Sequence, residues 1–170
     1  MRLSVPRALL FALAGIAPAA FGAPAAPPDW PNVDPRVAPL VRGPLAQAAA
    51  RLSTPGCASL LADLADVRTG RPLGETLARS GLNAGGWLRS LHVLPGDGRA
   101  DCVPGRTLAF TPVGSRVVWV CPLALERLRR SQRSLVANVL VHESLHSLGL
   151  GENPPSSEEI SLLVESRCGR

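Results

Sequence analysis

Lysine and tyrosine are absent from this 170-residue chain, and Met1 is its only methionine. All 18 basic residues are therefore Arg, a bias that we attribute to genome base composition rather than to function. The formal net charge is +5, but no nucleic-acid-binding motif accompanies it, so no nucleic-acid partner is predicted. The one basic cluster is interpreted as a solvent-exposed helix face, with an anionic polymer as the alternative ligand: Arg127, Arg129, Arg130 and Arg133.

The chain also lacks a Cys-x-x-Cys pair, which argues against a zinc site built from cysteines. Its four cysteines form an even set in a chain that we expect to be exported, so two disulfides are predicted. Four cysteines allow three pairings. We favour Cys102 with Cys121, which flank a predicted hairpin, and Cys57 with Cys168, which would join the first helical region to the C-terminus.

No apolar run is long enough to cross a membrane, and the N-terminal one is followed by small residues rather than by a cysteine. Residues 1–22 begin with Arg2 and Arg7 and continue with this apolar run, which is the pattern of a signal peptide. Residues 23–44 are rich in Pro and Ala and are predicted to be a linker or a loosely docked arm. We expect residues 45–170 to form one secreted or periplasmic domain without stable membrane insertion.

Hydrophobic spacing and turn residues predict an α+β fold. A strand is expected over residues 87–93, and a β-hairpin is expected where residues 106–111 and 116–121 flank Pro112-Val113-Gly114-Ser115. A short final helix should follow the two prolines after Asn153, with Ser156 or Ser157 as its cap. Four helices are expected before it: residues 45–52, 57–67, 72–80 and 122–148.

The most informative motif is His142-Glu143-Ser144-Leu145-His146, which lies in an apolar stretch that is predicted to be helical. Residues four apart on a helix share one face, so His142 and His146 can bind one metal ion. Glu143 points elsewhere and can act on a water molecule at the metal without being a ligand. The alternative is a core helix with two buried, hydrogen-bonded histidines.

Gly149 and Glu152 extend this motif to H-E-x-x-H-x-x-G-x-x-E. The run resembles the zincin metallopeptidases, and residues 142–160 are similar to secreted bacterial proteins of the metallopeptidase class with a Gly-Glu-Asn-Pro-Pro-Ser run. The resemblance implies a minimal zincin-like domain, one Zn²⁺ ion, and a peptide or protein substrate extended beside an edge strand, here the predicted hairpin. In the metzincin branch a glycine reverses the chain at this point and a third ligand, usually His, follows three residues later. Met1 cannot supply the Met-turn of that branch.

Glu152 stands at the position of that third ligand, and we predict that it completes the metal site with the two histidines. Gluzincins instead take a Glu from a downstream helix, so Glu158 and Glu159 are alternatives, as is His92. Glu159 also has a possible structural role, because Ser156-x-x-Glu159 fits a capping box.

The resemblance implies that a zinc-activated water attacks the peptide carbonyl while Glu143 serves as general base. Since the chain has no tyrosine, the donor to the tetrahedral intermediate would be His92, Arg106 or Arg116, or the zinc alone. The predicted function is a secreted zinc-dependent metallopeptidase. The alternatives are a zincin-like amide hydrolase of cell-wall peptides and a non-catalytic metal-binding or adhesion module. The sequence indicates neither substrate specificity nor oligomeric state.

Overall fold

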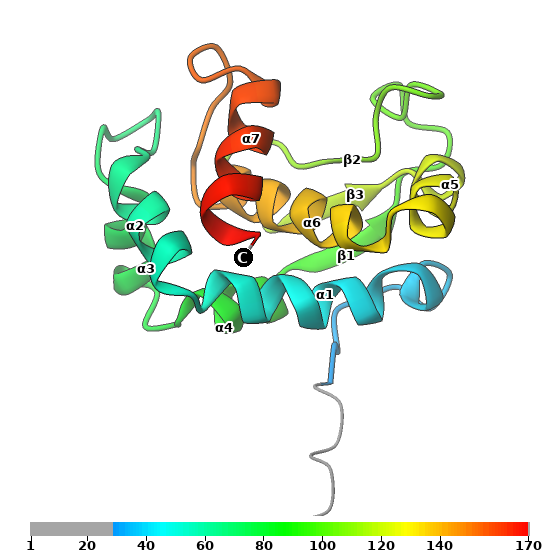
Figure 1. Cartoon of the computed structure of the whole chain (residues 1–170), viewed down its shortest axis with the longest axis horizontal. Helices are drawn as coiled ribbons and strands as arrows, with labels where there is room; N and C mark the ends of the chain where they lie inside the picture. The colour runs from blue at the N-terminus through cyan, green and yellow to red at the C-terminus, as the bar shows by residue number, and fades with distance from the viewer. Residues whose placement is uncertain (1–28, 170) are drawn as a thin grey trace, which may run out of the picture.

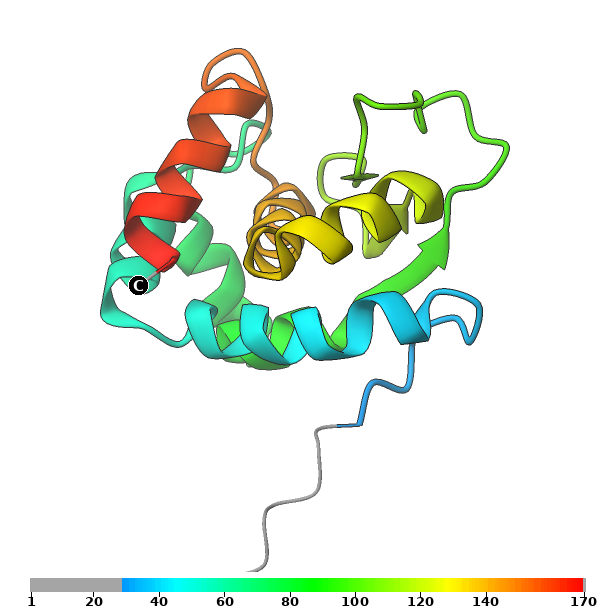
Figure 2. The same ribbon diagram turned by 45° about the vertical axis from the view of Figure 1, so that its right-hand side comes forward.

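Helix α6 (Arg133–Ser147), which contains the two motif histidines, lies at the centre of the fold. The computed structural model describes residues 29–169, so the predicted signal peptide at residues 1–22 lies outside the described range. Helix α1 (Ala38–Leu52) runs below α6, and α7 (Ser157–Cys168) stands beside it, in both Figure 1 and Figure 2. Together with a small sheet, these helices confirm the predicted α+β class.

A three-stranded sheet packs against α6. It contains β1 (His92–Pro95), β2 (Ala109–Phe110) and β3 (Val117–Val120) in the order β1-β3-β2, with β1 parallel and β2 antiparallel to β3. The predicted hairpin is therefore confirmed, with shorter strands than expected. Because β2 lies at an edge of this sheet and contacts α6, it runs close to the histidine motif.

The prediction of a linker is wrong over residues 38–44, because the chain is helical from Ala38 to Leu52. Val37, Val41 and Leu45 recur every four residues and are fully buried, so they form the apolar stripe of a helix that packs on α6 and α4. The prolines of this segment favoured the prediction of a linker over that of a helix, although the apolar residues have helical spacing. Pro39 lies in the first turn of α1, where a missing N–H costs no helical hydrogen bond.

Two further expectations are corrected. The predicted strand over residues 87–93 is helical in its first part, where it belongs to α4 (Ala84–Ser90). This helix is capped by Asn83, whose side chain accepts a hydrogen bond from the Gly86 N–H. The predicted single helix over residues 122–148 is divided into α5 (Pro122–Ser131) and α6. The division falls at Gln132, which leaves the helical conformation with φ −148° and ψ 70° although neither Gly nor Pro is present there.

Both predicted disulfides are present, Cys57 with Cys168 and Cys102 with Cys121. The first joins α2 (Pro55–Asp63) to the end of α7, and the second joins the loop before β2 to the residue that follows β3. Helix α3 (Leu73–Arg79) packs on α2 and matches its predicted position. Among the described residues, no helix has both the length and the apolar character required to cross a membrane.

The two disulfides should differ in their effect on stability. The Cys57–Cys168 bridge spans 111 residues and the Cys102–Cys121 bridge spans 19. Loop entropy in the unfolded chain then predicts that removing the first lowers the free energy of unfolding by about 5 kcal/mol and the second by about 3 kcal/mol. Urea unfolding of the two double-alanine variants measures this difference, and a larger loss from the short bridge would contradict it.

Candidate metal centre

Helix α6 places His142 and His146 one turn apart on the same face. Their Nε2 atoms lie 2.9 Å apart, and both residues are buried. The helix ends directly after them, because Leu148 is its C-cap and Gly149 has a φ of 115°, a value that favours glycine. The Gly149 N–H donates to the His146 carbonyl and the Leu150 N–H donates to the Leu145 carbonyl, so the chain turns back over the end of the helix.

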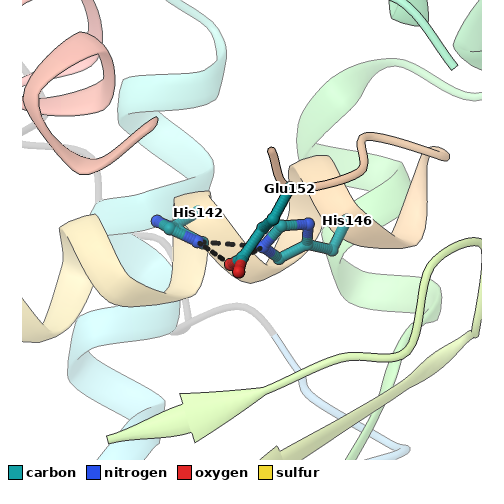
Figure 3. A group of neighbouring side chains, drawn as sticks. All are labelled: His142, His146 and Glu152. Carbon is teal, nitrogen blue, oxygen red and sulfur yellow. Dashed lines mark hydrogen bonds and ion pairs between the residues drawn. The ribbon is translucent and has the colours of Figure 1, made fainter. Parts of the chain in front are cut away.

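This reversal brings Glu152 to the two histidines. Figure 3 shows the carboxylate pointing at both imidazoles, with Oε1 3.3 Å from Nε2 of His146 and 3.9 Å from Nε2 of His142. The Glu152 side chain is 42% exposed, whereas those of His142 and His146 are 9% and 7% exposed. Two buried imidazoles and one accessible carboxylate therefore meet at a single point.

The three side chains fit a divalent metal ion, and their ligand atoms could hold one. Tetrahedral zinc with ligand bonds of about 2.0–2.1 Å places its ligand atoms about 3.3–3.4 Å apart. The separations in this cluster, 2.9, 3.3 and 3.9 Å, scatter around that value. Two imidazole nitrogens and one carboxylate oxygen are a zinc donor set that leaves a fourth position open to water.

Hydrogen bonds on the far side of each ring orient the two histidines. The Nδ1–H of His146 donates to the Leu150 carbonyl at 2.9 Å, which leaves its Nε2 as the free lone pair. Nδ1 of His142 lies 3.1 Å from the Ser161 hydroxyl on α7. Partners of this kind fix the direction of an imidazole toward a metal. Burial lowers the pKa of His142 to about 4, and electrostatic repulsion from the nearby His146 ring acts in the same direction, so His142 is unprotonated at neutral pH.

Glu143 follows His142 on α6 and is 5% exposed. Burial raises the pKa of its carboxyl to about 8; the neighbouring Thr111 hydroxyl acts in the opposite direction, and the Glu152 charge raises the pKa further. Glu143 Oε2 and Thr111 Oγ1 are the buried side-chain oxygens or nitrogens that lack a hydrogen-bond partner among the described residues. Both residues line the cleft beside the cluster of His142, His146 and Glu152.

A cleft of about 980 Å³ opens over this cluster. Its floor includes His142, Glu143 and His146 of α6. One wall is β2 with the loop that follows it, and the opposite wall is the face of α7 that carries Ser161 and Glu165. The cluster of His142, His146 and Glu152 therefore lies in a cleft between an edge strand and a helix.

The structure places the alternative ligands elsewhere. The Glu159 carboxylate accepts hydrogen bonds from the Ser156 N–H and hydroxyl at 2.8 and 2.9 Å, which completes the predicted capping box of α7. Glu158 is exposed in the first turn of α7, and His92 is exposed on β1. None of the three belongs to the cluster formed by His142, His146 and Glu152 in the described part of the chain.

Of the expected donors to a reaction intermediate, only Arg106 lines the cleft. The Arg116 guanidinium lies 3.9 Å from the centre of the Trp87 ring and donates to the Ser90 hydroxyl, so it is held against α4. Sequence analysis missed two residues of the site, Thr111 and Ser161. For Thr111, the sequence offered one signal, its position at the end of a predicted hairpin strand. For Ser161 it offered none, because the approach of α7 to α6 is a tertiary contact.

Comparison of the chain with protein-family models and with curated proteins finds no match, and comparison of its structure with solved structures finds none either. The geometry of the site is therefore the basis for any functional assignment.

The geometry predicts which carboxylate binds the metal. Loss of a residue that only supports a ligand commonly costs about 10- to 100-fold in metal affinity, so Glu152→Ala should weaken zinc binding by at least about 100-fold. Glu159→Ala should leave the affinity within about twofold, because its carboxylate caps α7. Chelator competition at one pH measures both variants, with His142→Ala and His146→Ala as reference losses. A loss confined to Glu159→Ala would refute the assignment.

Proposed function

We propose that this protein is a zinc-dependent metallopeptidase of the zincin type. The observation that carries the proposal is the convergence of His142, His146 and Glu152 beside the buried carboxyl of Glu143, on the floor of an open cleft. A protein that only stored or sensed a metal would have no use for a buried carboxyl with an unpartnered oxygen at this place. Hydrolysis requires such a group as a proton acceptor.

The roles of the residues follow from their positions. Zinc held by the three ligands would lower the pKa of a water in its open coordination position and would polarise the substrate carbonyl. A cation held by these ligands would favour the ionised form of Glu143, whose carboxylate would then accept a proton from the attacking water and pass it to the leaving amine. Ser161 and the Leu150 carbonyl keep the two imidazoles aimed at the metal.

The free edge of β2 is suited to an extended peptide. The Cys121 N–H donates to the Leu108 carbonyl, and the pairing of Ala109 with Val120 continues the antiparallel register. In an antiparallel pair, successive residues direct their backbone N–H and C=O groups alternately toward the partner strand and away from it. Those of Ala109 and Thr111 point away from β3, toward the cleft. A substrate backbone can add there as a further strand, so peptides of many sequences could bind.

The proposed location is outside the reducing cytoplasm. Two disulfides are compatible with secretion or with the periplasm, because such bonds persist in oxidising compartments. Cleavage of the predicted signal peptide, residues 1–22, belongs to the same proposal.

A single substitution tests the proposed chemistry. Glu143→Gln keeps the shape of the side chain but removes the proton acceptor, so turnover should fall by about 10²–10⁴-fold while zinc content stays at one equivalent. Digestion of a broad peptide library by zinc-loaded protein with both disulfides formed measures the loss.

The matched control is Glu75→Gln, which makes the same chemical change on the exposed surface of α3 and should leave turnover unchanged. Undiminished turnover in Glu143→Gln would exclude its role as base. Failure of the unmodified protein to cleave any library peptide, while it digests cell-wall peptides, would favour the alternative amide hydrolase.

A further inference from the structure

Thr111 occupies a fixed position beside the general base that we propose. It follows β2 directly, and it shares with Ala109 the buried face of this strand, whereas Phe110 between them is only partly buried. Because β2 packs on α6, this face is directed at the helix that carries Glu143. Thr111 is 8% exposed and lines the cleft together with Glu143.

The loop after Thr111 is fastened to the metal helix. The Gly114 N–H donates to the His146 carbonyl at 2.8 Å, and the Ser115 N–H donates to the Pro112 carbonyl at 2.8 Å. Pairing of Phe110 with Trp119 holds the other side of Thr111. Its backbone is therefore held from both directions, and a β-branched side chain has few rotamers to choose from. The Thr111 hydroxyl thus has a defined place relative to α6.

The unsatisfied hydrogen-bonding groups of Thr111 and Glu143 indicate that the two side chains can pair. Thr111 Oγ1 and Glu143 Oε2 are both buried and both lack a partner among the described residues. Thr111 can donate one hydrogen bond, and an ionised carboxylate can accept several. The two side chains line the same cleft, beside the cluster of His142, His146 and Glu152. A small movement of either side chain would satisfy a donor and an acceptor together.

We propose that Thr111 is the positioning residue for Glu143, whose carboxylate it holds by a hydrogen bond from its hydroxyl during the reaction. This inference rests on the proposed function, since it assigns a partner to the proposed base. One carboxylate oxygen bonded to Thr111 fixes the rotation of the group and leaves the other oxygen aimed at the attacking water. Thr111 acts through Glu143 and needs no contact with the substrate.

Three substitutions separate the hydroxyl from the shape of the side chain. Thr111→Val keeps a similar shape but removes the hydroxyl, whereas Thr111→Ser retains the hydroxyl. Thr111→Ala also removes the hydroxyl, and its smaller side chain provides a second test if the valine variant does not fold. The first measurement is ¹³C NMR of Glu carboxyl carbons in the zinc-loaded protein, with the Glu143 resonance assigned by its loss in Glu143→Gln. We expect this resonance to shift in Thr111→Val and Thr111→Ala and to stay in place in Thr111→Ser.

The second measurement is peptide hydrolysis. A misdirected base should lower kcat by about 10- to 100-fold in Thr111→Val, with KM within about twofold, and Thr111→Ser should restore most of kcat. Equal losses in the valine and serine variants would mean that Thr111 has a merely structural role and would overturn the proposal. So would an unchanged Glu143 resonance in Thr111→Val. If the unmodified protein cleaves no peptide, the proposed function fails, whereas the NMR shifts still decide whether Thr111 bonds to Glu143.

Discussion

The site depends on the contact between Gly149 and Asp66. A Cβ at Gly149 would lie 2.4 Å from the Asp66 carboxyl carbon, and the residue already requires a φ of 115°. Only glycine therefore allows the chain to turn at the end of α6 while pressed against this carboxylate. Since Glu152 reaches the histidines through that turn, the cluster of His142, His146 and Glu152 requires the close approach of these two chain segments.

Asp66 is buried and charged, so its surroundings must compensate for lost hydration. Burial raises the pKa of Asp66, but hydrogen bonds from the backbone and side chain of Arg68, with Thr69, lower it below its usual range. The next N–H, that of Val67, donates to the Gly149 carbonyl at 3.0 Å. The turn between α2 and α3 therefore supports the loop that carries Glu152.

Residues close together in the sequence account for most of what could be predicted. One helix end and the turn after it contain the whole candidate metal cluster, which consists of His142, His146 and Glu152. Their spacing in the sequence was therefore enough to predict that they come together. The capping box of α7 is equally local. The arrival of Thr111 and Ser161 at the site depends on packing between segments that are distant in the sequence. No pattern within a short window encodes such contacts.

The exposure of the three candidate metal ligands is uneven, with 42% for Glu152 against 9% and 7% for His142 and His146. An ion arriving from solvent would meet the carboxylate first and pass to the imidazoles afterwards. Histidine nitrogens would then decide which ions are retained, because soft and borderline metals prefer them. Movement of the Glu152 side chain, which lies on a surface loop, would govern how fast ions exchange. Selectivity and exchange rate would thus be properties of different residues.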